Sequence, residues 1–93
     1  MLFLAGGPEE SGGQCLDEKD QTIPVDDGDN VPVLKGLSKE TCLSGCLLVD
    51  GATGCAFNKD SLYLKCFAIK RSVTKGDGKG GICWKFNPDN GKS

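Results

Sequence analysis

The chain has 93 residues, a net charge of −2 and no histidine. A chain of this length forms one small domain, which often needs covalent stabilisation. The lack of histidine excludes Ser-His and Cys-His nucleophile systems, and no apolar run approaches the ~20 residues that span a membrane. We therefore expect a noncatalytic domain without a cofactor and without membrane insertion.

The charges are distributed unevenly along the chain. Residues 1–34 contain eight acidic side chains and one basic, whereas residues 35–93 contain ten basic and five acidic. The two halves either attract each other within the fold or leave a basic face for acidic partners. The sequence alone leaves both interpretations open.

Six cysteines in so short a chain are typical of a disulfide framework in a secreted protein. A zinc site is the poorer explanation, because the chain lacks both histidine and a Cys-x-x-Cys pair. Six cysteines permit fifteen pairings, and spacing alone does not choose among them. We expect a secreted, disulfide-stabilised module that holds no metal ion.

The N-terminal third predicts a linker followed by extended segments. Residues 1–13 are rich in Gly, Pro, Glu and Ser, so we expect a flexible linker to the rest of a longer protein, with the folded domain over residues 14–87. Pro24 and Pro32 restrict their segments to edge strands or extended loop. The acidic turn at 26–30 invites a calcium site, but it lacks the ligand spacing of an EF-hand loop.

A helix is predicted to begin at Ser38 and to end at Asp50-Gly51. Ser38 can cap the free backbone N–H groups of the first turn, and Gly51 can adopt the left-handed conformation that ends a helix. Gly45 within the helix indicates that a neighbouring group comes close at that point. One face of this helix carries two cysteines and two leucines, namely Cys42, Leu43, Cys46 and Leu47.

Three apolar runs after the helix predict strands at 54–58, 62–69 and 82–86, followed by a polar tail at 88–93. Side chains alternate between the two faces of a strand. If Cys66 faces the helix, Tyr63, Lys65, Phe67 and Ile69 lie on the opposite face of their strand.

Two sets of residues are candidate binding sites. A basic set on the 70–81 loop and its neighbours can attract sulfated glycosaminoglycan, unless it is simply a solvated loop. An apolar set either forms a protein-interaction patch or is covered by residues 15–34 as a second layer, and its tyrosine could also stack on a galactose-like ring. The basic set is Lys65, Lys70, Arg71, Lys75, Lys79 and Lys85, and the apolar set is Tyr63, Phe67 and Ile69.

The cysteine pattern resembles that of the PAN/apple domain. The matching features are Cys-x-x-x-Cys on a helix, the run Gly-Cys-Ala-Phe, a cysteine in an apolar strand, and one early and one late cysteine. The resemblance covers residues 15 to about 86 and implies an α+β fold, with a central helix packed across an antiparallel sheet of about five strands. It also implies nested disulfides, which are Cys15–Cys83, Cys42–Cys66 and Cys46–Cys55.

Apple domains occur in coagulation proteases, growth factors and the microneme adhesins of apicomplexan parasites, where they bind proteins or carbohydrates. The resemblance therefore implies a secreted, noncatalytic module that mediates protein–protein adhesion, such as host-cell attachment. The alternative that it implies is a carbohydrate-binding module for galactose or for sulfated glycosaminoglycan. We expect a protein partner first and no binding of nucleic acid.

Overall fold

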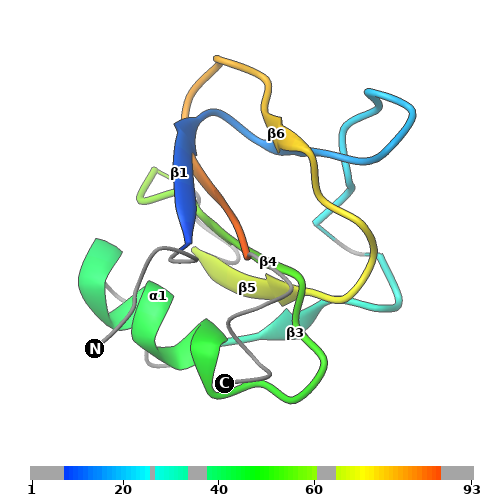
Figure 1. Cartoon of the computed structure of the whole chain (residues 1–93). Coiled ribbons are helices and arrows are strands. Elements are labelled where there is room, and N and C mark those ends of the chain that lie inside the picture. The colour runs from blue at the N-terminus through cyan, green and yellow to red at the C-terminus, as the bar shows by residue number, and fades with distance from the viewer. Residues whose placement is uncertain (1–7, 26, 34–37, 61–64, 87–93) are drawn as a thin grey trace.

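The computed structural model describes residues 8–25, 27–33, 38–60 and 65–86. It shows the expected α+β architecture, in which one helix packs on an antiparallel sheet with the strand order β1-β7-β4-β5-β3 (Figure 1). A separate two-stranded sheet pairs β2 with β6. The elements are β1 (Glu9–Gly12), β2 (Cys15–Leu16), β3 (Val31–Pro32), α1 (Lys39–Leu47), β4 (Gly54–Phe57), β5 (Cys66–Ile69), β6 (Lys75–Gly76) and β7 (Ile82–Lys85).

The two central strands are covered on both faces. Every residue of β4 and of β5 is buried, although antiparallel sheets commonly leave one face in water. The helix lies along one face of the sheet, and the segment that carries β2 and β6 lies away from it, toward the top of Figure 1. Alternation along the strands therefore divides the apolar side chains between two cores.

We call these two groups the helix-side core and the N-terminal-side core. The helix-side core contains Cys42, Cys46, Cys55, Phe57, Cys66, Ala68 and Trp84. The N-terminal-side core contains Cys15, Ile23, Ala56, Phe67, Ile69, Val73 and Cys83. Four of the six cysteines thus lie in the first core and two in the second.

The start of helix α1 is the one that the sequence predicts. Ser38 caps it: the Thr41 N–H donates to Ser38 Oγ at 3.2 Å, and the Ser38 N–H donates to Thr41 Oγ1 at 3.0 Å. The helix ends at Leu47, earlier than expected, because tight turns follow in which the N–H groups of Leu48 and Val49 donate to carbonyls three residues back. Gly51 has a positive φ of 83°, in agreement with the prediction of a left-handed residue.

Gly45 allows the helix to approach the edge of the sheet. A Cβ atom at this position would lie 2.5 Å from Cγ1 of Val33, which follows β3. This confirms the expectation that a neighbouring group comes close at Gly45. Pro32 lies in β3, an edge strand, which also agrees with its missing N–H.

The predicted boundary of the N-terminal linker was wrong. Residues 9–12 form β1, which pairs with β7 from Glu9 opposite Lys85 to Gly12 opposite Ile82. Their polar and glycine-rich composition concealed a strand whose pairing is entirely long-range. Residues 1–7, the tail at 88–93 and the first part of the predicted 62–69 strand lie outside the described residues.

Candidate functional site

The three disulfides join the cysteines in the pairs that the resemblance implies. Cys42–Cys66 and Cys46–Cys55 connect the helix to β5 and β4, with Cα–Cα distances of 5.6 and 5.8 Å. Cys15–Cys83 connects β2 to β7 at 5.2 Å and closes most of the chain, over a sequence separation of 68. The helix is therefore attached covalently to the two central strands.

The structure does not bring the predicted basic residues together in one patch. Lys65 and Lys70 flank β5 at opposite ends, which a strand rise of ~3.3 Å per residue places roughly 16 Å apart. Lys85 lies at the Lys70 end, because Gly54 pairs with both Ile69 and Lys85. A linear polyanion would therefore have to cross the sheet to contact both groups.

Lys75 and Lys79 lie on a third part of the surface, beside the N-terminal segment. Lys75 pairs with Leu16 in the two-stranded sheet, and the segment around Lys79 is fixed by Asp77. The Asp77 carboxylate accepts the N–H groups of Lys79 at 2.8 Å and of Gln14 at 3.0 Å, and these hydrogen bonds lower the pKa of Asp77. The glycine-rich connection is thus held in place by a charged side chain.

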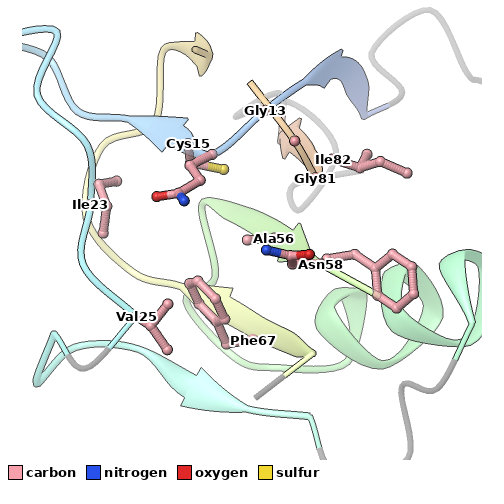
Figure 2. A pocket seen from close by; sticks show the side chains of 12 residues that line it. Gly13, Cys15, Ile23, Val25, Ala56, Asn58, Phe67, Gly81 and Ile82 are labelled. Atoms are coloured by element: carbon pink, nitrogen blue, oxygen red, sulfur yellow. The ribbon is translucent and has the colours of Figure 1, made fainter. Parts of the chain in front are cut away.

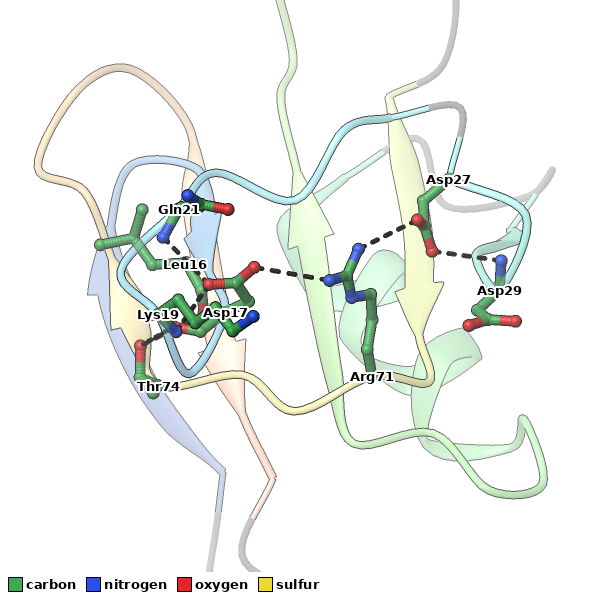
Figure 3. Close-up of polar contacts among 8 residues, drawn as sticks. All are labelled: Leu16, Asp17, Lys19, Gln21, Asp27, Asp29, Arg71 and Thr74. Atoms are coloured by element: carbon green, nitrogen blue, oxygen red, sulfur yellow. Dashed lines mark hydrogen bonds and ion pairs between the residues drawn. The ribbon is translucent and has the colours of Figure 1, made fainter.

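Arg71, the sixth member of the basic set, is occupied by internal ion pairs. Its guanidinium donates to Asp27 Oδ1 at 3.1 Å and to Asp17 Oδ2 at 3.4 Å, so it bridges two acidic loops (Figure 3). Its backbone carbonyl also accepts a hydrogen bond from the hydroxyl of Thr53. The assignment of Arg71 to a free basic face is therefore corrected, because acidic groups from the first half of the chain neutralise it.

Asp17 is the buried partner in this arrangement, with 7% of its surface exposed. Its Oδ1 accepts the N–H groups of Gln21 at 3.0 Å and Lys19 at 2.8 Å. These hydrogen bonds, that of Gln21 first, together with the Arg71 charge outweigh desolvation and lower the pKa of Asp17. The carboxylate is thus ionised and fully engaged at neutral pH.

The acidic turn is also engaged internally. Asp27 Oδ2 accepts the N–H of Asp29 at 3.2 Å while its Oδ1 faces Arg71, and Asp26 lies outside the described residues. Within the described part of the chain, all three ion pairs join an acid of the first half to a base of the second, the third being Glu10 with Lys39 at 3.0 Å. This supports the interpretation that the charges complement each other within the fold.

The apolar set does not form an exposed patch. Phe67 is 6% exposed and Ile69 is fully buried, because Cys15 and Ile23 of the N-terminal segment cover them. The expectation of an interaction patch at these two residues is therefore corrected in favour of a second layer. Tyr63 lies outside the described residues.

A groove that sequence reasoning missed lies at the end of the sheet where β4 ends and β7 begins. We call it the Asn58 groove. It has a volume of about 430 Å³ and is lined by Ser38, Lys39, Phe57, Asn58, Lys59, Asp60, Gly81 and Ile82. These residues come from the helix start, the turn after β4 and the start of β7, so no local sequence pattern contains them all.

A small apolar pocket of about 40 Å³ adjoins the groove and shares Phe57, Asn58, Gly81 and Ile82 with it. Figure 2 shows Phe67 of the sheet on one side of this pocket, with Ile23 and Val25 of the N-terminal segment beside it. The pocket thus continues the Asn58 groove between the sheet and the N-terminal layer.

The groove combines apolar and polar groups without a strong net charge. Phe57 and Ile82 are its apolar members, and its rim carries two lysines and one aspartate. The charge of Lys39 is neutralised by its ion pair with Glu10, and the opposite charges of Lys59 and Asp60 on the rim cancel. Asn58 fixes the turn, because its side-chain carbonyl accepts the N–H of Asp60 at 3.1 Å. Such a surface can bind a neutral, partly apolar ligand.

Within the described residues the one helix, α1, has nine residues and is too short to span a membrane. Comparisons of the chain with protein-family models, with curated proteins and with solved structures each find no significant match.

Proposed function

We propose that this chain is a noncatalytic, extracellular binding module of the PAN/apple type, and that the Asn58 groove binds a protein partner. The groove is the observation that carries the proposal. A concave surface of about 430 Å³ with apolar members and a polar rim has the composition of a peptide-binding site. An exposed loop of a partner could place an apolar side chain against Phe57 and Ile82.

The disulfides support an extracellular role. All six cysteines are paired, and such bonds persist in oxidising compartments. A disulfide framework is typical of small secreted modules that repeat within larger proteins. Because the cysteine pattern resembles that of apple domains, we propose a role in adhesion, such as host-cell attachment by a microneme-type adhesin.

The engagement of the carboxylates supports a noncatalytic role. The chain has no histidine, so an acid or base would have to come from Asp, Glu, Lys or Tyr. Asp17 and Asp77 accept two backbone N–H groups each, and both have a lowered pKa. These carboxylates stay ionised and hold loops in place, which does not suit them to proton transfer at neutral pH.

A carbohydrate is the second candidate ligand. The Asn58 groove suits a neutral saccharide better than a sulfated one, because its charges nearly balance. A glycosaminoglycan would instead need the separated lysines at both ends of β5, and Arg71 is already paired. The groove therefore favours galactose over heparin as the saccharide alternative.

The test is binding of the labelled, disulfide-intact chain to cells and to a glycan array. Cells are used untreated, after removal of surface proteins by protease, and after removal of glycans by glycosidase. Loss of binding after protease alone supports the protein partner. Binding to neutral galactosides on the array would assign the groove to a saccharide, and binding only to sulfated chains at low salt would contradict the proposal.

Two charge reversals at exposed lysines provide the matched control. Lys59→Glu alters the rim of the groove, whereas Lys70→Glu makes the same change at the opposite end of the sheet. We expect Lys59→Glu to weaken cell binding at least about tenfold and Lys70→Glu to leave it unchanged. Equal effects of the two variants would place the site outside the groove.

A further inference from the structure

The two disulfides of the helix side lie against each other, so that four sulfur atoms form one buried cluster. Sγ of Cys42 lies 3.5 Å from Sγ of Cys55, and Sγ of Cys46 lies 4.0 Å from Sγ of Cys66. In both contacts the two sulfur atoms come from different disulfides. All four sulfur atoms lie within 4.8 Å of one another. The four residues are at most 1% exposed.

This arrangement is close to that of a tetrahedral tetrathiolate site. Zn–S bonds of ~2.3 Å place the ligands of a tetrahedron about 3.8 Å apart. Two of the four sulfur–sulfur distances between the disulfides, 3.5 and 4.0 Å, already lie near this value. The two bonded pairs would have to separate by about 1.7 Å each once the S–S bonds are broken, and no other pair of these sulfur atoms is more than 4.8 Å apart.

The elements that carry the ligands favour a soft divalent cation. Two sulfurs come from successive turns of α1 and one each from β4 and β5, and the burial of all four cysteines closes the site to solvent. Thiolate is the ligand type that selects zinc over calcium or magnesium. One helical turn between Cys42 and Cys46 takes the place of the Cys-x-x-Cys turn that sequence analysis looks for.

We propose that the reduced chain binds one Zn²⁺ ion through Cys42, Cys46, Cys55 and Cys66, so that metal replaces the two disulfides as the link between helix and sheet. Two equivalents of a dithiol reductant open the two S–S bonds, giving four cysteine thiols and two oxidised reductant molecules. Zn²⁺ then binds the four sulfurs and releases four protons. Binding therefore strengthens as the pH rises.

Cys15 and Cys83 lie in the other core and take no part in this site. Their separation provides a control with an equal number of thiols. The C15A/C83A variant retains the four proposed ligands, whereas the C46A/C55A variant retains four cysteines but only two ligands. Both reduced variants offer metal the same number of sulfurs, so nonspecific binding to an unfolded chain is matched.

The experiment titrates the whole reduced chain, without oxygen, with Co²⁺ and then with Zn²⁺. We expect wild type and C15A/C83A to bind one Co²⁺ with the visible absorption of a tetrahedral thiolate complex, which Zn²⁺ displaces. The C46A/C55A variant should bind at least about 1,000-fold more weakly, because it loses two ligands. Equal affinity of the two variants would overturn the proposal.

Two readouts, the first on wild type, locate the metal within the fold. Trp84 shares the helix-side core with the four cysteines and stands opposite Cys55 in the sheet, so metal should restore its near-UV circular dichroism. In reduced C15A/C83A, where the four proposed ligands are the only thiols, zinc should also protect them from alkylation. Metal binding without recovery of the Trp84 signal, or without protection of these four thiols, would contradict the site.

Discussion

The two cores of this domain are built by different means. In the helix-side core, two disulfides with sequence separations of 24 and 9 fix one helix to adjacent strands. In the N-terminal-side core, one disulfide of separation 68 and the ion pairs of Arg71 hold extended segments from both ends of the chain. The first core is joined by disulfides between segments that are near in sequence. The second is joined by a disulfide between distant segments and by ion pairs.

This difference indicates how the small domain covers both faces of its sheet. The two buried residues of the nine-residue helix, Cys42 and Cys46, are both in disulfides, so the helix is held on its face of the sheet largely by covalent bonds. The other face has no helix and relies on the 15–25 segment, whose loops need Arg71 to neutralise their acidic residues. Acidic residues of the first half of the chain thus form ion pairs with basic residues of the second half within the fold.

Full reduction in the presence of a metal chelator should have the largest effect. The chain-entropy model assigns about 4.4, 3.5 and 2.7 kcal/mol to the loops closed by Cys15–Cys83, Cys42–Cys66 and Cys46–Cys55. Their total of about 11 kcal/mol rivals the whole stability of a typical domain. We expect the chelated, reduced chain to lose its near-UV circular dichroism. Retained tertiary structure would contradict this account.

Removing one disulfide at a time compares the two cores directly. We expect C15A/C83A to lower the free energy of unfolding by about 4 kcal/mol and C46A/C55A by just under 3 kcal/mol, because loop closure grows with loop length. Urea denaturation of the otherwise oxidised chain measures both. A reversed order would show that packing of the buried sulfurs outweighs loop length.

Phe67→Ala should have an effect similar to the loss of one disulfide, and it tests the packing of the N-terminal-side core. Because Phe67 is 6% exposed, its truncation should cost about 3 to 5 kcal/mol. Urea denaturation provides the measurement. Val25→Ala, at a 39% exposed neighbour beside the same small pocket, is the control and should change stability by less than about 1 kcal/mol. A small effect of Phe67→Ala would restore the interpretation of an exposed patch.

Much of the helix-side core is predictable from sequence because its signals are local. Ser38 marks the helix start, and Gly45 indicates a close approach, although only the structure shows that Val33 is the neighbour. The disulfide pairing needed the family resemblance, since spacing left fifteen choices. Regular alternation in the strands then separates Phe67 and Ile69 from the helix.

The N-terminal-side core and the groove are less predictable because their contacts are long-range. Arg71 meets Asp17 and Asp27 across 54 and 44 residues, and no local pattern distinguishes such an arginine from a solvated one. Strand β1 consists of Glu, Glu, Ser and Gly, residues with low strand propensity, and exists because β7 pairs with it. Lys65 and Lys70 are near each other in sequence, but strand β5 places them at opposite ends of the sheet, which the sequence alone does not show.

Acidification tests the charges that hold the second core, with an effect smaller than that of Phe67→Ala. The folded pKa of Asp17 lies below its ordinary value of 3.8, so its stabilising contribution is present above that value and is lost as the pH falls through the lowered pKa. We expect the urea midpoint to fall between pH 5 and pH 2, and Asp17→Asn to flatten this dependence.

Oδ1 of the asparagine can still accept the N–H groups of Gln21 and Lys19, so Asp17→Asn preserves the turn while it removes the charge and the Oδ2 acceptor of Arg71. The remaining slope should come in part from Asp77, whose pKa is also lowered. If the variant loses as much stability on acidification as wild type does, ionisation of Asp17 does not stabilise this core.

The smallest effect tests whether the helix-side core depends on packing as well as on disulfides. Gly45→Ala should gain up to about 1 kcal/mol of helix propensity, but its Cβ would meet Cγ1 of Val33 at 2.5 Å. Crowding of this kind costs about 1 to 3 kcal/mol, so we expect net destabilisation of about 1 kcal/mol. In a Val33→Ala background the clash disappears, and Gly45→Ala should become stabilising. A double-mutant cycle by urea denaturation measures this coupling, and equal effects of Gly45→Ala in both backgrounds would leave the disulfides as the main link between helix and sheet.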